Sequence, residues 1–338
     1  MAVLVTGAAG FIGYHVCNAL LARGESVVGV DNLSDYYDVR LKRARLAVLE
    51  AHAAFAFHAL DLADHERVLA TLGAHRSVGA AGPGRIDRVI HLAAQAGVRY
   101  SVDHPFAYVQ ANLVGHVAVL ELCRRLPGFV HLVYASSSSV YGANTAMPFS
   151  VADRTDTPLS LYAATKKADE LMSHSYAHLY RIPQTGLRFF TVYGPWGRPD
   201  MALWIFCEKI LAGEPIPVFN HGDMKRDYTF VADIVAGVIA ALDRPPVDTG
   251  DAPPQRLYNI GNHRSETLTR LIGVLEAALG REAILDPQPM QPGDVYETFA
   301  DIDDIRADLG YEPTTPIDVG IPAFVDWYRS WLAGSPTP

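Results

Sequence analysis

The chain has 338 residues, of which 49% are hydrophobic and 19% are charged, and its formal net charge at pH 7 is −9. This composition is typical of a globular protein with an ample core, and the negative charge argues against nucleic acid or an anionic membrane as a partner. We expect neither a signal peptide at the start nor an apolar run approaching the ~20 residues that span a bilayer.

The first 31 residues follow the order strand, glycine-rich turn, helix, strand, acid. A β-branched run at 3–6 leads into the turn, an amphipathic segment follows to about residue 23, and a second apolar run at 27–30 ends at Asp31. The turn glycines are Gly7, Gly10 and Gly13. This is the layout of a dinucleotide-binding unit, whose glycines allow a tight turn, close approach of a pyrophosphate and close packing of the helix on the strand.

Asp31 bears on the choice of cofactor. It lies where a carboxylate can accept both hydroxyls of the adenosine ribose, and a 2′-phosphate there would meet a negative charge. The sequence therefore favours NAD over NADP. Because the spacing G-x-x-G-x-x-G differs from G-x-G-x-x-G, a glycine-rich turn in another kind of α/β protein is the alternative interpretation.

Strand-like and helix-like segments alternate through the first half of the chain. A charged helical insert is expected over 36–50 and a longer helix over 106–125. Further strands are expected at 55–60, 88–92, 129–134 and 185–189. This alternation predicts an α/β fold built on a doubly wound, parallel Rossmann sheet.

The pattern changes after about residue 190, where proline becomes frequent and the elements become shorter. We therefore predict an NAD-binding Rossmann domain over 1–190 and a smaller mixed C-terminal portion, 191–338, that mainly binds the substrate. A helical run at 229–242 is expected to return to the first domain, within a return segment of about 229–245. The second portion then forms one wall of a cleft. Glycine and proline place a surface loop at 79–84.

Tyr162 and Lys166 form a Y-x-x-x-K pair. On a helix these positions share a face, so the ammonium lies beside the phenol, favours the phenolate and makes Tyr162 a candidate general base. Such pairs often occur by chance on surfaces. Here the pair follows a strand that ends in four serines, 136–139, whose hydroxyls can bind the same substrate oxygen. The 13 histidines show no metal-ligand spacing, so no metal is expected.

The three cysteines, at positions 17, 123 and 207, are far apart and form no C-x-x-C motif. We interpret them as reduced thiols in or near the core, which is typical of a cytoplasmic protein.

Taken together, these motifs resemble the extended short-chain dehydrogenase/reductase family over nearly the whole chain. Within that family the chain is similar to the nucleotide-sugar epimerases, and in particular to the UDP-glucuronate 4-epimerases. The stretches that carry the resemblance are 6–13, 31–37, 91–101, 134–142, 162–166, 187–199, 225–228 and 291–295.

The resemblance implies NAD-dependent 4-epimerisation of a UDP-sugar, first of all UDP-glucuronate to UDP-galacturonate. Tyr162 would take the proton of the C4 hydroxyl while the C4 hydride passes to the nicotinamide. The 4-keto sugar would then turn about its link to UDP and receive the hydride on its other face. Ser137 would hold the C4 oxygen, with Ser138 as the alternative, and Lys166 would also bind the nicotinamide ribose.

The resemblance also implies which residues bind each ligand. The cofactor-binding residues are Gly7, Gly10, Phe11, Ile12, Gly13, Asp31, Asn32, Asp61, Leu62, Ala93, Asn112, Tyr162 and Lys166. The substrate-binding residues are Arg99, Ser137, Ser138, Thr191, Arg198, Arg226 and Asp294. Among these, Arg226 matches a contact to the UDP phosphates and Asp294 a contact to the uridine ribose. Thr191 and Arg198 match positions that meet the sugar carboxylate.

Other activities stay open. A UDP-glucose/UDP-galactose 4-epimerase typically has Asn where this chain has Thr191, and a UDP-glucuronate decarboxylase typically has Glu in place of Ser139. The 4,6-dehydratases carry an acidic pair that is absent from 136–139. An NAD-binding sensor or scaffold is the non-enzyme alternative, although such proteins usually lose Tyr162 or Lys166. Relatives often dimerise through two helices, so we expect a homodimer through 106–125 and 162–180.

Overall fold

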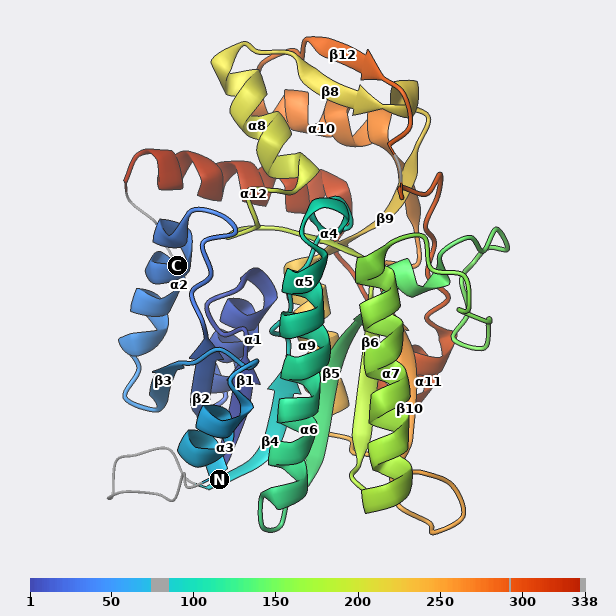
Figure 1. Cartoon of the computed structure of the whole chain (residues 1–338). Coiled ribbons are helices and arrows are strands. Elements are labelled where there is room, and N and C mark those ends of the chain that lie inside the picture. Colours follow the sequence, from blue (N-terminus) through green and yellow to red (C-terminus); the bar gives the residue numbers. More distant parts are fainter. Residues whose placement is uncertain (74–84, 292, 335–338) are drawn as a thin grey trace.

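The computed structural model describes residues 1–73, 85–291 and 293–334 (Figure 1). The loop expected at 79–84 and Pro292 of the 291–295 stretch lie outside the described residues.

A seven-stranded sheet forms the centre of the structure, with the order β10-β6-β5-β4-β1-β2-β3 (Figure 1). Its strands are β1 (Ala2–Thr6), β2 (Ser26–Asp31), β3 (Phe55–Ala59), β4 (Ile86–His91), β5 (His131–Ser137), β6 (Gln184–Phe189) and β10 (Gln255–Ile260). Every neighbouring pair is parallel. The chain reverses direction across the sheet between β1 and β4, where a doubly wound sheet leaves a crevice for ligands. The predicted fold class is confirmed.

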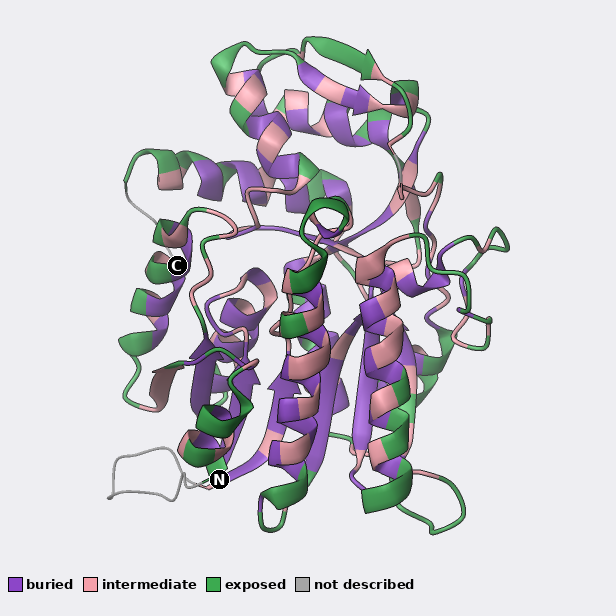
Figure 2. Cartoon of the chain, viewed as in Figure 1, coloured by how far each residue is buried: buried purple, intermediate pink, exposed green. Residues whose placement is uncertain are grey.

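Helices cover both faces of this sheet, which explains why β1 is buried along its whole length and apolar from Ala2 to Val5. Val3 and Val5 join the core cluster that includes α1, whereas Leu4 points to the opposite cluster beside α6. The helices of this part are α1 (Phe11–Ala22), α2 (Val39–Glu50), α3 (His65–Gly73), α4 (Tyr100–Asp103), α5 (Pro105–Tyr108), α6 (Gly115–Arg125), α7 (Leu161–Tyr180), α9 (Val231–Leu242) and α11 (Asp303–Leu309). The inner strands of the sheet are buried, the edge strand β3 is mostly intermediate, and the outer faces of the helices are exposed (Figure 2).

A smaller mixed portion lies above the carboxyl ends of the central strands (Figure 1). It contains a three-stranded sheet, β11-β9-β7, with one antiparallel and one parallel pairing, and a two-stranded sheet, β12-β8. Its strands are β7 (Thr191–Tyr193), β8 (Ile216–Phe219), β9 (Lys225–Phe230), β11 (Ser265–Thr267) and β12 (Leu285–Gln288), and its helices are α8 (Ala202–Ala212), α10 (Leu268–Leu279) and α12 (Ile317–Leu332).

The return to the central sheet differs in detail from the expectation. Thr229 and Phe230 end strand β9, and helix α9 begins at Val231 because Phe230 is still extended. The chain also returns a second time through β10, which pairs with β6 and extends the sheet. The division of the chain at residue 190 stays a prediction.

The segment Pro105–Arg125 corrects an expectation about apolar runs. It has 21 residues, and the mean hydropathy of its most apolar 18-residue stretch is 1.3, so it is long and apolar enough to cross a membrane by length and composition alone. It is not one regular α-helix, because a π-helical segment, η1 (Val109–Val114), lies between α5 and α6. Half of this apolar stretch is buried against the rest of the chain, and core helices of globular proteins reach the same length and hydropathy.

Candidate functional site

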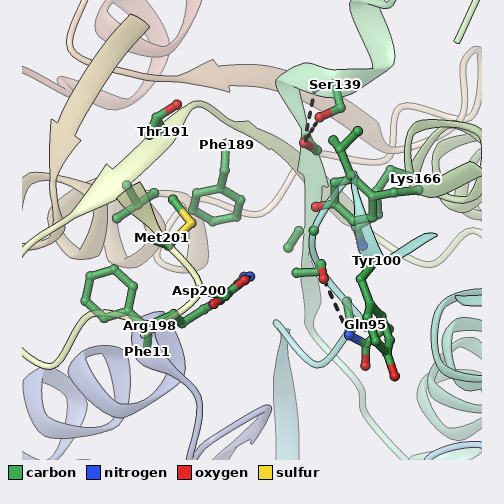
Figure 3. A pocket seen from close by; sticks show the side chains of 18 of the residues that line it. Phe11, Gln95, Tyr100, Ser139, Lys166, Phe189, Thr191, Arg198, Asp200 and Met201 are labelled. Carbon is green, nitrogen blue, oxygen red and sulfur yellow. Dashed lines mark hydrogen bonds and ion pairs between the residues drawn. The ribbon is translucent and has the colours of Figure 1, made fainter. Parts of the chain in front are cut away.

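A cavity of about 950 Å³ opens at the carboxyl ends of the central strands, beneath the smaller portion (Figure 3). It is lined by the loops that follow β1, β2, β3 and β4 and by residues of β5, α7, β7 and β9. The cavity therefore occupies the crevice that the strand order predicts.

The glycine-rich turn has no room for side chains. Gly7 has a φ of +72°, and a Cβ atom added to Gly13 would lie 2.0 Å from the Gly7 carbonyl oxygen. A Cβ atom at Gly10 would lie 2.9 Å from the same oxygen. Helix α1 begins directly after Gly10 without a side-chain cap, so the N–H groups of its first turn remain for a ligand. This cradle fits the pyrophosphate of a dinucleotide.

Asp31 lies at the end of β2 and is 7% exposed. Its Oδ2 accepts a hydrogen bond from the Ala9 N–H at 3.2 Å, and its Oδ1 accepts one from the Leu33 N–H at 2.8 Å. Lys42, on α2, places its Nζ 3.8 Å from Asp31 Oδ1. The carboxylate is thus held at the ribose end of the cradle, beside a lysine that the sequence motifs did not single out.

Asn32 and Asp61 close the same end of the cavity. The Asn32 side-chain amide donates to Asp61 Oδ2 at 3.1 Å, and Asp61 Oδ1 accepts from the Ala63 N–H at 2.9 Å. Leu62 follows Asp61 on the cavity wall and is buried. These contacts bring the loops after β2 and β3 together, as a site for an adenosine group requires.

Tyr162 and Lys166 both line the cavity from the first turns of α7. The Ser160 hydroxyl caps this helix by accepting from the Ala163 N–H at 3.1 Å, and this bond fixes where the helix begins. The Lys166 ammonium donates to Asp169 Oδ2 at 3.0 Å, and both side chains are buried. Burial raises the pKa of the Asp169 carboxyl to about 6, against the opposing effect of Lys166.

The four serines at the end of β5 divide into two groups. The Ser136 hydroxyl donates to Glu170 Oε1 at 2.7 Å and is therefore used within the protein. Ser137 accepts from the Ser139 N–H and donates to the Ser139 hydroxyl, both at 3.2 Å, at the start of a 3₁₀ turn. All four serines line the cavity, and Ser136 differs in that its hydroxyl is bonded to a buried carboxylate.

Asn112 is the one predicted site residue that does not line this cavity. Its side-chain amide donates to Thr165 Oγ1 at 2.9 Å and to the Gln95 carbonyl at 3.1 Å. Its oxygen accepts from the Gln95 N–H at 2.8 Å. With every polar atom engaged, this buried side chain braces the loop after β4 against α7, and its expected contact with the cofactor stays a prediction.

Arg198 faces the cavity already paired with an acid. Its Nε donates to Asp200 Oδ1 at 2.9 Å, and its Nη2 contacts the other Asp200 oxygen. The Tyr36 hydroxyl also donates to Asp200, at 3.1 Å. Burial acts against the Asp200 carboxylate, but Arg198 and Tyr36 together lower its pKa below the usual value. Thr191 lies on β7, across the cavity from Ser139 and Lys166 (Figure 3).

A second charged group joins the smaller portion to the loop after β4. The Arg226 guanidinium donates to Asp294 Oδ1 at 3.2 Å, and Arg99 Nη2 lies 3.6 Å from Asp294 Oδ2. The Arg99 guanidinium also lies 4.6 Å from the centre of the Phe219 ring. Three residues that the resemblance assigns to the substrate therefore lie together.

The sequence missed several residues of this cavity: Tyr36, Lys42, Asp200 and Phe219. Asp200 was detectable, because an acid two residues after Arg198 is a candidate partner. Lys42 gave no signal, since lysine in a charged helix is normally solvated. In the part of the chain that the structure describes, no group of three or more histidine, cysteine, aspartate or glutamate side chains is placed to hold a metal ion.

Comparison with known proteins gives consistent matches over the whole chain. A model of the NAD dependent epimerase/dehydratase family matches residues 3–261. The chain is 47% identical over 342 residues to UDP-glucuronate 4-epimerase 4 of Arabidopsis thaliana, covering 98% of this chain and 76% of that protein. It is 44% identical over 340 residues to the probable UDP-glucuronate 4-epimerase of Rhizobium meliloti (strain 1021), covering 97% of each.

A solved structure agrees with these relatives. The fold matches the crystal structure of UDP-glucuronic acid 4-epimerase from Bacillus cereus in complex with UDP-glucuronic acid and NAD, with a TM-score of 0.86. The two chains are 33% identical, and the match covers 98% of this chain and 100% of the other.

Proposed function

Because this chain belongs to the NAD dependent epimerase/dehydratase family, we propose that it interconverts UDP-glucuronate and UDP-galacturonate by epimerisation at C4. The observation that carries the proposal is one cavity that contains the glycine cradle, the Tyr162–Lys166 pair and the arginines of the sugar-nucleotide end. The 4-epimerases that this chain resembles support the same substrate.

In this proposal, NAD held in the cavity would supply the hydride chemistry at C4 of the sugar. The cradle of Gly7, Gly10 and Gly13 holds the pyrophosphate, and Asp31 holds the adenosine ribose. Tyr162 takes the proton of the C4 hydroxyl, and Lys166, which lines the same cavity, is the proposed partner of the nicotinamide ribose. Phe11, Ile12, Asn32, Asp61, Leu62 and Ala93 complete the proposed cofactor contacts, and all of them line the cavity.

Ser137 is the proposed partner of the C4 oxygen, with Ser138 as the alternative. Both line the cavity, as does Ser136, but the Ser136 hydroxyl already donates to the buried Glu170 carboxylate. A hydroxyl that donates to the C4 oxygen stabilises the negative charge that develops there in either direction of the reaction.

The UDP half of the substrate must supply the binding affinity, because a sugar that rotates between two hydride transfers cannot be tightly held. We assign the phosphates to Arg226 and the uridine ribose to Asp294, with Arg99 beside them. Arg226 and Asp294 pair with each other at 3.2 Å, so a nucleotide has two charged side chains already in place. Arginine suits this task, since its planar guanidinium binds phosphate oxygens in pairs.

Thr191 and Arg198 are the proposed holders of the sugar carboxylate. A carboxylate beside a 4-ketone is a β-keto acid, which loses CO₂ readily, so an epimerase must keep this group away from the geometry that allows the loss. Asp200 engages Nε and Nη2 of Arg198. The rigid guanidinium therefore offers its remaining N–H groups to the sugar.

A second candidate function follows from that same ion pair. Asp200 offsets part of the positive charge of Arg198. A neutral sugar, unlike a sugar carboxylate, does not require a positively charged partner at this position. Interconversion of UDP-glucose and UDP-galactose is therefore the alternative activity. UDP-glucuronate decarboxylation comes next, and NAD binding without catalysis is the non-enzyme alternative.

The deciding experiment incubates the purified protein, without added cofactor, with UDP-glucuronate and follows the sugar by proton NMR. Signals of UDP-galacturonate that grow to a steady ratio are the expected result. Formation of UDP-xylose would indicate decarboxylation instead. If nothing changes, UDP-glucose is added to the same sample, and turnover there would favour the alternative epimerase. No turnover of either sugar, even with added NAD, would favour the binding-only protein.

We also propose a homodimer that forms through the segment 105–125 and α7. Apolar side chains on this side of the molecule are open to solvent, including Phe106 at 80% and Leu179 at 61% exposed. Exposed apolar patches of this kind are typical of association surfaces. Light scattering should give twice the chain mass, and Phe106→Asp should lower it. A monomeric mass for the unaltered protein would refute the dimer.

For its location, we propose the cytoplasm. Cys17, Cys123 and Cys207 are buried and unpaired, as is usual in a reducing compartment. Detection of the protein in a membrane or secreted fraction would contradict this assignment.

A further inference from the structure

Lys42 is a buried ammonium group at the ribose end of the cavity. Its side chain is 9% exposed, lines the cavity and places Nζ 3.8 Å from Asp31 Oδ1. The ring of Tyr37 lies below it, with the ring centre 5.1 Å from Nζ. Lysine is rarely buried without a partner, so this position calls for a specific role.

Asp31 does not accept a hydrogen bond from the Lys42 ammonium. A separation of 3.8 Å between nitrogen and oxygen is an ion pair but is too long for a hydrogen bond. Both oxygens of Asp31 instead accept main-chain N–H groups, from Ala9 and Leu33. Within the described ranges, Lys42 has the ion pair and the ring contact but no hydrogen bond. Its N–H groups therefore remain to donate to a ligand.

Arg45, one turn further along α2, shows the contrast. It is fully buried, and its guanidinium donates to the Ala9 carbonyl at 3.0 Å, to the Tyr37 hydroxyl at 2.8 Å and to the Trp196 carbonyl. These bonds fasten the glycine-rich turn to the start of the smaller portion. Arg45 is thus occupied with structure, and Lys42 is the neighbouring cation that faces the ligand.

We propose that Lys42 is a specificity-determining residue of the dinucleotide site, which donates to the adenosine ribose beside Asp31 and would receive a 2′-phosphate once the charge of Asp31 is removed. The inference rests on the proposed cofactor site. It changes the argument for NAD over NADP, because Lys42 balances the charge of Asp31 at short range. The choice between NAD and NADP then depends on the carboxylate of Asp31 alone, because the Lys42 ammonium already lies beside it.

The test measures nucleotide binding rather than turnover. Lys42→Met, Asp31→Ser and the double variant are compared with the unaltered protein, and Arg43→Met, exposed on the same helix, is the control. The nucleotide released on acid denaturation is identified, and nucleotide-free protein is titrated with NAD and with NADP. We expect Lys42→Met to weaken NAD binding about tenfold. Asp31→Ser should strengthen NADP binding about tenfold or more, and adding Lys42→Met should abolish that gain.

Two results would overturn the inference. One is equal NADP affinity for Asp31→Ser with and without Lys42→Met, and the other is unchanged NAD affinity for Lys42→Met. Lys42→Arg in the Asp31→Ser background should keep the increased affinity for NADP. This variant shows whether Lys42→Met acts by removing the positive charge or by disturbing the fold. If the unaltered protein binds neither nucleotide, it is the proposed function that fails.

Discussion

The two ends of the cavity are built in different ways. The cofactor end consists largely of main-chain groups from neighbouring positions, since the glycine turn and Asp31 all lie within 31 residues. The sugar-nucleotide end consists of charged side chains from distant segments, such as Arg99 on the loop after β4, Arg226 on β9 and Asp294. The main-chain cradle is a single local motif, whereas the charged side chains lie in separate stretches whose pairing with one another the sequence does not show. Because these side chains are already paired with one another, a bound ligand must replace an existing ion-pair partner.

Tyr162 lines the cavity that both ends share and is the proposed general base, so Tyr162→Phe should have the largest effect. Without the hydroxyl the proton of the C4 oxygen has no acceptor, and turnover should fall by about 10³-fold or more. The bound NAD content should stay unchanged, because the cradle is intact. Proton NMR and nucleotide release measure the two quantities. Tyr180→Phe, at the exposed end of α7, is the control, and full activity of Tyr162→Phe would contradict the proposed general base.

A buried ion pair between Glu170 on α7 and Arg188 on β6 supports the central sheet on which the cavity is built. It accepts two hydrogen bonds from Arg188, at 2.8 and 2.9 Å, and both side chains are buried. Glu170→Gln removes the negative partner and should lower the free energy of unfolding by about 3–5 kcal/mol.

Urea unfolding measures the effect of Glu170→Gln. The control is Asp156→Asn, whose ion pair with Arg154 is exposed, and it should change stability by less than about 1 kcal/mol. Equal effects of the two variants would mean that burial of the Glu170–Arg188 pair is unimportant.

Gly13→Ala tests the main-chain end directly. The added Cβ atom would lie 2.0 Å from the Gly7 carbonyl oxygen, so the turn must move. We expect a stability loss of about 3 kcal/mol and protein purified without NAD. Gly273→Ala is the matched control, because no atom lies within 4 Å of its added Cβ, and there a helical alanine should stabilise by about 0.5–1 kcal/mol. Retained NAD in Gly13→Ala would exclude the cradle as the pyrophosphate site.

Arg198→Ala tests the side-chain end and should have the smallest effect. We expect kcat/KM for UDP-glucuronate to fall by about 10–100-fold and that for UDP-glucose to change little. Some UDP-xylose should form, because the β-keto acid is no longer restrained. Arg154→Ala, fully exposed, is the control. Unchanged turnover of UDP-glucuronate by Arg198→Ala would refute the role in carboxylate binding.

The strands of the first half could be predicted because each combines an apolar run with a flanking turn, as in 27–30 before Asp31. The strand β10 could not, since its residues, QRLYNI, form neither a continuous apolar run nor a strict alternation, and only pairing with β6 shows that it belongs to the central sheet. The segment 105–125 has helical periodicity, but its apolar pattern does not reveal the π-helical interruption at Val109–Val114.

By itself the sequence determined the chemistry of the site: the glycine turn, Asp31, and the Tyr162–Lys166 pair. Each of these depends on residues a few positions apart, and short-range geometry relates such residues in any fold. Only the tertiary structure decided that Asn112 supports the wall, that Asp200 holds Arg198 and that Lys42 stands behind Asp31. The reason is physical, because a charge or an amide acquires its role from what it is buried against, and those partners come from distant parts of the chain.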